Sequence, residues 1–285
     1  MAKAPATSEK SRVINLFERS RRKAPELALD IPTPATATSV AAPAAYVIPA
    51  GKPKLLLAIG SGKTGKSTLL RFLAERATER EGTALATLAP NRTLAHYFPE
   101  TLHPDGNSTS SGAAFLEMFL DAVGDGQMNA LLDFPGDDTA LLHLLDQGLN
   151  PVSMLEQAGV EVVALYTLSP RVEDLTAMAQ LVAKGFNPKA TALVMNKGVT
   201  ADPTISAEPE FDQITDHSAY RAAADRGAVP IWMPRLYSAK AIEDRRLLFR
   251  QAQSGDQLGL ADRSRTHHWL RAMEDAFRPI ESWLP

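Results

Sequence analysis

The chain alternates short apolar runs with stretches whose apolar residues recur at helical spacing. The apolar runs predict buried strands, at Lys54–Ile59, 83–88, Asn129–Asp133, 160–168, 191–196 and Val229–Met233. The helical stretches are 66–79, 112–123, 139–149, 153–158, 172–184, 217–226, 238–253 and 263–278. Strands that alternate with helices favour parallel pairing through right-handed crossovers, with helices on both faces of the sheet. The pattern therefore predicts a three-layer α/β domain with a mostly parallel sheet.

The first 53 residues lack this alternation. Residues 1–23 carry seven basic and two acidic side chains, a net charge of +5. Half of the residues in 24–53 are Ala or Pro, a composition that buries little surface and prevents a continuous helix. We therefore expect a basic, disordered tail at 1–23, an Ala/Pro-rich linker at 24–53 and a folded domain at 54–285. Within the domain, the polar, proline-containing residues 202–216 predict a long loop.

The composition narrows the functional classes. The 285 residues include no cysteine, which excludes disulfides, thiolate metal sites and a cysteine nucleophile. No apolar run approaches the roughly 18 residues that a membrane span needs. The N-terminus also lacks the apolar stretch of a signal peptide. These features predict a soluble, cytoplasmic protein.

The charge is unevenly distributed along the chain. The net charge is −3 overall and +5 in residues 1–23, so the remainder carries −8. A basic tail on an acidic body is typical of contact with nucleic acid, acidic lipid or an acidic protein, and a solvated tail fits the composition equally well. Residues 8–23 place Val13, Ile14 and Phe17 on one side of a short amphipathic helix. Such a helix is marginal alone in water, and it is suited to docking on a protein partner or a membrane.

A glycine-rich segment joins the first predicted strand to the first predicted helix. It fits the P-loop pattern G-x-x-x-x-G-K-[ST] and consists of Gly60, Ser61, Gly62, Lys63, Thr64, Gly65, Lys66, Ser67 and Thr68. Glycines let successive backbone N–H groups surround one anion, and the helix N-terminus adds partial positive charge. Lys66 then reaches the β- and γ-phosphates, and Ser67 supplies a ligand to Mg²⁺. A chance Gly/Ser turn is the alternative, but strand, spacing and helix together favour binding of ATP with Mg²⁺.

A P-loop also needs an acidic group on the magnesium side, at the end of a neighbouring strand. Asp133 closes an apolar run and precedes Phe134, Pro135 and Gly136. Its carboxylate is suited to hold Mg²⁺ or a water bound to it, and the Pro-Gly pair begins a loop able to sense the γ-phosphate. A simple helix cap is the alternative role for Asp133. The metal role is favoured because the P-loop requires such a residue independently.

The residues at the end of the predicted strand 191–196 indicate which nucleotide base the site prefers. Asn196 and Lys197 stand where GTPases carry N-K-x-D, but the fourth position is Val199. The carboxylate that reads the amino groups of guanine is therefore absent, which disfavours GTP. Asn196 remains a candidate to hydrogen-bond a purine edge, and Pro234, after the last strand, a candidate to pack against the ring.

These elements together resemble the ParA/MinD superfamily of P-loop ATPases, over roughly residues 54–250. The resemblance rests on the P-loop, the Asp133 segment, Asn196 and the run VPIWMP at 229–234. Within the superfamily, the stretches PNRTLAHY and LEQAGVEV are similar to the TraL/StbB branch of plasmid transfer and stability proteins. The resemblance implies an ATP-dependent homodimer that acts in plasmid partition, stability or conjugation.

The chain departs from the family's pattern at two places. The family's signature lysine lies five residues before the P-loop lysine, where this chain has Ser61; Lys63 follows, where the family prefers glycine. The family's water-positioning Asp lies after the second strand, but residues 87–90 (TLAP) hold no carboxylate. Asp137 and Asp138 are candidates to compensate, although no spacing requires it. Phosphoryl transfer depends on positioning and electrostatics, so these losses imply slow or absent hydrolysis.

Three functions compete. The first is a ParA/MinD-like nucleotide-dependent switch or slow ATPase, with Lys66 and Asp133 as its catalytic residues. The second is a non-hydrolysing nucleotide-binding adaptor that recruits a protein partner through the N-terminal tail. The third is a small-molecule kinase, for which the chain shows no Arg-rich lid. Related ATPases bind DNA non-specifically through basic residues, which here, unless they form a solvated helix face, are Arg235, Lys240, Arg245, Arg246 and Arg250.

Overall fold

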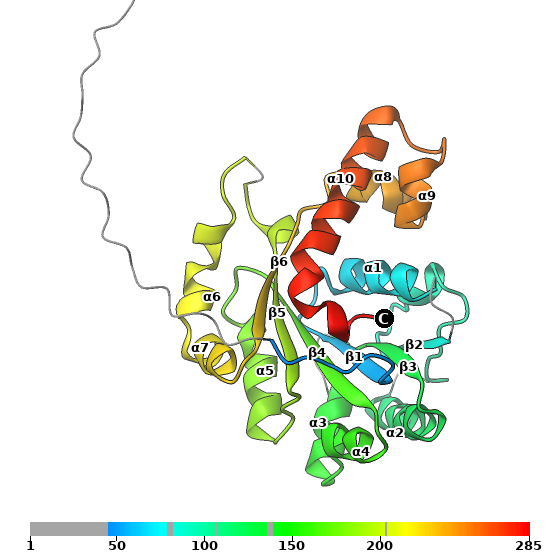
Figure 1. The fold of residues 1–285 in the computed structure, drawn as a ribbon, viewed down its shortest axis with the longest axis vertical. Helices are drawn as coiled ribbons and strands as arrows, with labels where there is room; N and C mark the ends of the chain where they lie inside the picture. Colours follow the sequence, from blue (N-terminus) through cyan, green and yellow to red (C-terminus); the bar gives the residue numbers. More distant parts are fainter. Residues whose placement is uncertain (1–44, 79–81, 107, 136–138, 203) are drawn as a thin grey trace, which may run out of the picture. The chain divides into compact units, whose positions relative to one another are not determined.

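The computed structural model describes residues 45–78, 82–106, 108–135, 139–202 and 204–285. Six strands form one sheet in which all neighbours are parallel, in the order β2-β3-β1-β4-β5-β6 (Figure 1). The strands are β1 (Lys54–Ile59), β2 (Thr83–Thr87), β3 (Asn129–Asp133), β4 (Glu161–Leu168), β5 (Ala190–Asn196) and β6 (Val229–Met233). The predicted α/β class is confirmed, and the sheet is wholly parallel rather than mostly so.

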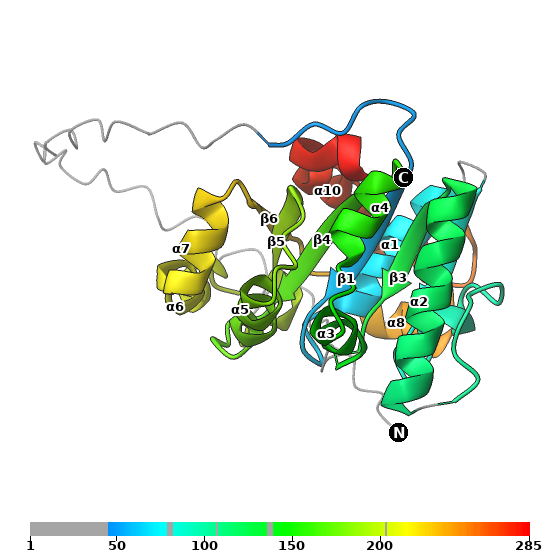
Figure 2. The same ribbon diagram turned by 90° about the horizontal axis from the view of Figure 1, so that it is seen from below.

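Helices cover both faces of the sheet. Figures 1 and 2 show α1 and α10 on one face and α2, α3, α4 and α5 on the other. The α-helices are α1 (Lys66–Thr78), α2 (Thr109–Gly126), α3 (Thr139–Asp146), α4 (Pro151–Gln157), α5 (Asp174–Ala183), α6 (Asp212–Asp216), α7 (Ser218–Asp225), α8 (Ala239–Asp244), α9 (Phe249–Ser254) and α10 (Leu260–Phe277). Short 3₁₀ helices are η2 (Leu94–His96), η3 (Lys197–Val199), η4 (Glu208–Phe211) and η5 (Arg278–Trp283). None of the helices in the described part of the chain is long and apolar enough to cross a lipid bilayer.

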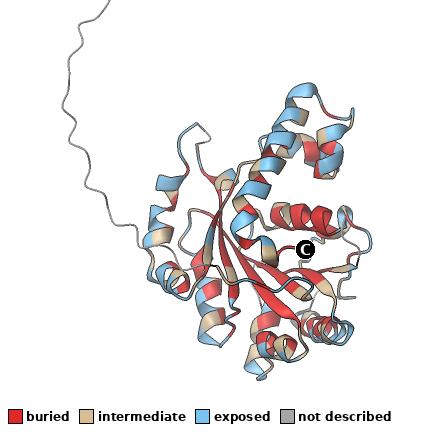
Figure 3. Ribbon diagram, in the orientation of Figure 1, coloured by how far each residue is buried: buried red, intermediate tan, exposed pale blue. Residues whose placement is uncertain are grey.

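The central strand β1 shows why the sheet needs two helical layers. Leu55, Leu57 and Ile59 point into the hydrophobic cluster beneath α2, α3 and α4. Leu56 and Ala58 point into the opposite cluster, with α1 and α10. All five are at most 1% exposed, so the strand is buried on both faces (Figure 3). A nearly continuous apolar run is therefore the sequence expected for this strand.

The predicted helix at 238–253 is wrong as a single element. Helix α8 ends at Asp244 and α9 begins at Phe249. Between them, Arg246 takes a positive φ of 51° and Leu247 turns inward to become 4% exposed. Burial of Leu247 stabilises this break, because a continuous helix would carry the chain past the core.

The predicted loop at 202–216 contains ordered structure, which corrects that expectation. It forms η4 and α6 in its second half. Phe211 and Ile214 are fully buried, and the Phe211 ring meets Trp232 edge-on, with ring centroids 5.3 Å apart. These two apolar contacts fold a segment whose composition is otherwise typical of a loop.

The packed domain begins before Lys54, where the sequence places its start. A compact unit spans residues 43–285. Ile48 is 2% exposed, and the Trp283 indole donates to the carbonyl of Tyr46 at 2.5 Å. Residues 45–53 thus belong to the domain rather than to the linker. The predicted tail, its amphipathic helix and the rest of the linker lie outside the described residues.

Candidate functional site

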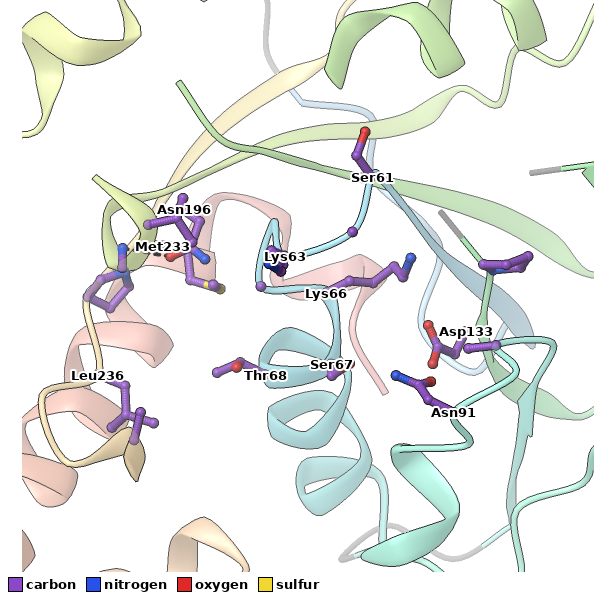
Figure 4. Close-up of a pocket in the computed structure, with 18 of the residues that line it drawn as sticks. Ser61, Lys63, Lys66, Ser67, Thr68, Asn91, Asp133, Asn196, Met233 and Leu236 are labelled. Atoms are coloured by element: carbon purple, nitrogen blue, oxygen red, sulfur yellow. Dashed lines mark hydrogen bonds between the residues drawn. The ribbon is translucent and has the colours of Figure 1, made fainter. Parts of the chain in front are cut away.

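A cavity of about 570 Å³ opens where strands β1, β2, β3, β5 and β6 end. Its size falls within the range of pockets that hold small ligands. All of the predicted site residues line it except Gly60 and Thr64. Figure 4 shows Lys66, Ser67, Asp133 and Asn196 among the residues that line it. Residues that the sequence did not assign to the site also line it, namely Ala89, Pro90, Asn91, Pro135, Gly198, Val199, Met233, Leu236 and Ala239.

The loop after β1 is held by close contacts that exclude larger residues. A Cβ atom at Gly60 would lie 2.3 Å from Oγ1 of Thr167, and one at Gly65 would lie 2.0 Å from Nδ2 of Asn196. Gly65 also has a positive φ of 92°. The buried Thr64 hydroxyl donates to the Ser61 carbonyl at 2.9 Å and lies 2.7 Å from the Thr167 hydroxyl. The local sequence therefore builds a fixed, narrow turn at the head of α1.

Lys63 occupies the backbone conformation that best suits glycine. Its φ is 69°, in the left-handed region, and its side chain is exposed. This accounts physically for the glycine that the resembling family prefers here, since a Cβ atom is strained at such a φ.

Lys66 and Ser67 start helix α1 and line the cavity. The first turn of the helix directs backbone N–H groups and partial positive charge toward the cavity. The Lys66 ammonium donates to the Gly60 carbonyl at 2.9 Å, which folds its side chain back across the loop. The arrangement places a cation, a hydroxyl and backbone donors around one anion-sized space.

Asp133 closes the cavity on the β3 side and is 1% exposed. Its Oδ2 accepts from the Thr87 hydroxyl at 3.3 Å, whereas Oδ1 is buried and has no hydrogen-bond partner among the described residues. Burial raises the pKa of Asp133 to about 6, against the opposing effects of the Lys66 charge and the Thr87 hydrogen bond. A buried carboxylate oxygen without a partner is costly, and a bound cation would remove that cost.

Asn196 lines the cavity at the end of β5 and is 4% exposed. Its Nδ2 donates to the Thr64 carbonyl at 2.9 Å, and its Oδ1 accepts from the Gly198 amide at 2.7 Å. The side chain thus ties the loop after β1 to the loop after β5, in addition to lining the cavity. Pro234 lines the same end, and its carbonyl accepts from the Trp269 indole at 3.0 Å.

The oxygen-bearing side chains of the cavity are too few to hold a metal ion on their own, but they are enough for a magnesium ion that also binds water and phosphate. Within the described ranges, no three His, Cys, Asp or Glu side chains gather as a metal site. Ser67 and Asp133 are the predicted protein ligands, and both line the cavity. Mg²⁺ typically takes only one or two protein ligands and completes its shell with water and phosphate oxygens. Asp137 and Asp138, the candidates to position water, lie outside the described residues.

The predicted DNA-contacting residues do not share one environment. Arg235 is half-buried and donates to the carbonyl and the hydroxyl of Thr200, at 2.8 and 2.7 Å. The other residues of the set are exposed on or beside α8 and α9, namely Lys240, Arg245, Arg246 and Arg250. Arg235 therefore stabilises the contact with Thr200, while the remaining four are exposed beside the acidic residues Glu243 and Asp244.

Sequence reasoning missed Thr87 and Asn91. Thr87 donates to Asp133 and accepts from the Ala89 amide at 3.1 Å, so it joins β3 to the loop after β2. Asn91 lies on that loop and lines the cavity. Residues 87–91, at the end of the second strand, hold no carboxylate, and their polar side chains in the sequence are the hydroxyl of Thr87 and the amide of Asn91.

Comparison with known proteins identifies no family. No family model matches the chain, and a search of curated proteins finds no match either. The resemblance to ParA/MinD-like ATPases therefore stays an interpretation of the motifs.

Proposed function

We propose that the cavity binds ATP with Mg²⁺ and that the chain acts as a nucleotide-dependent switch with slow hydrolysis. The observation that carries the proposal is Asp133, a buried carboxylate with one oxygen that has no hydrogen-bond partner among the described residues, which lines the same cavity as Lys66 and Ser67 at the start of α1. A hydrated magnesium ion with phosphate oxygens supplies the charge that this arrangement lacks.

The two ends of the cavity differ in character, which supports an orientation for the nucleotide. Strands β3 and β2 lie on one side of β1, and β5 and β6 on the other. The β3 side offers Asp133 and the polar Asn91, whereas the β6 side offers Met233, Pro234 and Leu236. The first suits phosphates and a cation, and the second suits a flat base. Val199 lines this second side without the carboxylate that would favour guanine.

Slow hydrolysis is proposed from the residues that catalysis would need. Ser61 replaces the family's signature lysine, and Ala89 stands in the segment where the family carries its water-positioning Asp. Residues suited to bind phosphate and magnesium line the cavity, namely Lys66, Ser67 and Asp133, whereas residues 87–90 at the end of the second strand offer no carboxylate to activate water. The resemblance extends the proposal to an ATP-dependent homodimer with a role in plasmid partition, stability or conjugation.

Nucleotide binding is tested with Lys66→Ala. We expect the full chain to bind ATP with Mg²⁺ in titration calorimetry, and Lys66→Ala to weaken that binding by at least about tenfold, because a charge-assisted contact to phosphate is lost. Lys189→Ala is the matched control, since this lysine is exposed, pairs with Glu156 and lies outside the cavity. Equal binding by wild type and Lys66→Ala, or no binding of ATP by either, would contradict the proposal.

Turnover and assembly separate the switch from its alternatives. We expect phosphate release to be slow in wild type, and the mass of the protein in solution to double only with ATP. Brisk, Lys66-dependent phosphate release would overturn slow hydrolysis. A partner complex that forms equally with and without nucleotide would instead favour the adaptor.

A further inference from the structure

Asn91 is a polar residue that lines the cavity and to which the proposed function assigns no contact. It lies between β2 and η2, on the side of the cavity that holds Asp133, Lys66 and Ser67. Figure 4 shows its amide turned toward the Asp133 carboxylate, beside Ser67. The side chain is exposed and makes no hydrogen bond with another residue of the described ranges. Its donor and acceptor are thus available to a ligand.

A fixed turn presents this amide. The Arg92 amide donates to the Ala89 carbonyl at 3.0 Å, which closes a turn with Pro90 and Asn91 at its centre. Proline at the first central position restricts the backbone before Asn91. The Arg92 guanidinium donates to the Pro104 carbonyl at 3.1 Å, on the far side of the turn. The turn is therefore anchored on the side away from the cavity.

The same loop is coupled to the candidate magnesium ligand. The Leu88 amide donates to the backbone carbonyl of Asp133 at 2.8 Å. The Thr87 hydroxyl donates to the Asp133 carboxylate and accepts from the Ala89 amide. The turn that carries Asn91 is thus linked to Asp133 through Thr87 and Leu88, although Asn91 and Asp133 lie far apart in sequence.

We propose that Asn91 contacts the terminal phosphate of the bound nucleoside triphosphate and so lets the site distinguish a triphosphate from a diphosphate. This rests on the proposed nucleotide site. β2, which leads into the Asn91 loop, pairs with β3 and lies on the opposite side of β1 from β5 and β6, where the apolar wall suits the base. A nucleotide laid across the loop after β1 therefore ends its phosphate chain at Asn91.

The chemistry of an amide suits this position. An amide N–H donates to a phosphate oxygen without adding charge, and its oxygen is free to accept from water. A carboxylate here would add a second negative charge to the side of the cavity that Asp133 lines. Asparagine therefore detects a phosphate that aspartate would repel.

The experiment compares two ligands on the full chain with Mg²⁺, ADP and a non-hydrolysable ATP analogue. We expect Asn91→Ala to weaken binding of the analogue by about tenfold, the loss of one hydrogen bond to a charged group. Binding of ADP stays within about twofold of wild type, since ADP lacks the terminal phosphate. Asn91→Asp lowers affinity for the analogue further, because it adds repulsion. Asn187→Ala, at an exposed asparagine outside the cavity, is the matched control and changes neither affinity.

The experiment distinguishes an error in the role of Asn91 from an error in the proposed nucleotide site. Equal weakening of both ligands, or no change in either, overturns the role of Asn91 while the nucleotide site stands. Absence of binding of both ligands to wild type overturns the site and this role together. Unchanged melting temperatures of both Asn91 variants show that the fold is intact, and an Asn91→Asp variant that binds the analogue as wild type does also overturns the role.

Discussion

Asp133 lies in surroundings that oppose its own charge. Its side chain is 1% exposed, one oxygen has a weak partner in Thr87, and the other has none among the described residues. Lys66 attracts the carboxylate but does not offset the loss of water, because the net effect is a pKa raised to about 6. Such a residue weakens the ligand-free fold, and that cost is typical of a site shaped for binding.

The replacement Asp133→Asn is therefore expected to stabilise the ligand-free protein in EDTA. The folded pKa of about 6 lies above the unfolded value, so the native state binds more protons and loses stability as pH rises from about 4 to 6. At pH 8 the variant gains about 1–3 kcal/mol in the free energy of unfolding, and the gain shrinks toward zero near pH 4. Urea unfolding at the two pH values measures it. A variant less stable than wild type at pH 8 would refute this account.

The residues of the site were predictable to the extent that they are local in sequence. The loop from Gly60 to Thr68 was recognisable because its glycines, lysine and hydroxyls are consecutive. Asp133 was recognisable because it ends an apolar run. Thr87 and Asn91 were not, because their roles follow from the pairing of β2 with β3, which no local pattern specifies. The clamp that Asn196 forms on Thr64 depends in the same way on strand order.

Helix α1 organises the short helix α9 through two buried charges. The Glu75 carboxylate accepts from the backbone amides of Phe249 and Arg250, at 2.6 and 3.0 Å, which satisfies the exposed N–H groups at the start of α9. Arg71, one turn earlier, donates to the Leu247 carbonyl at 2.9 Å. Its guanidinium also stacks on the rings of Tyr97 and Phe249. The break between α8 and α9 is thus held by side chains of another helix.

Removal of this cap is expected to be costly. Glu75→Ala leaves the backbone amides of Phe249 and Arg250 without their acceptor and Arg71 without its neighbouring carboxylate, and we expect a loss of about 2–4 kcal/mol in the free energy of unfolding. Glu117→Ala, at an exposed position of helix α2, is the matched control and changes stability by less than about 0.5 kcal/mol. Urea unfolding of the three proteins gives the comparison. Similar free energies for both variants would show that Glu75 does not act as a cap.

The strands and helices were predicted well where burial of apolar side chains determines the secondary structure. All six strands were expected near their observed places. The four inner strands are buried almost throughout and therefore need apolar runs, and the edge strands β2 and β6 are partly buried apolar runs. The single helix at 238–253 was wrong because helical periodicity cannot reveal a cap supplied by Glu75. The prediction of a loop at 202–216 was wrong because the segment has only two isolated apolar residues that become buried, Phe211 and Ile214, and two such residues do not produce a recognisable helical periodicity.

At the scale of the whole compact unit, the segment before β1 is joined to the C-terminus. Lys54 donates to the carbonyls of Ser282 and Leu284, at 2.8 and 3.0 Å. The Ile48 amide donates to the Ser282 hydroxyl at 3.3 Å. Ile48 itself packs in the hydrophobic cluster that contains Trp283 and α10. The two segments therefore close the same face of the sheet, although more than 200 residues separate them in sequence.

A chain that begins at Lys54 should consequently be less stable than one that begins at Pro43. The shorter chain loses the burial of Ile48 and the carbonyl of Tyr46 that accepts from Trp283, and we expect about 3–5 kcal/mol less free energy of unfolding. The chain from Pro43 keeps the contacts within the compact unit and is the reference for the comparison. Guanidinium unfolding of the two shortened chains measures the difference. Ile48→Ala in the full chain isolates the apolar part, at about 2–4 kcal/mol. Equal stability of the two shortened chains would contradict this account. The contacts of residues 45–53 would then contribute nothing to folding, and the segment would belong to the linker.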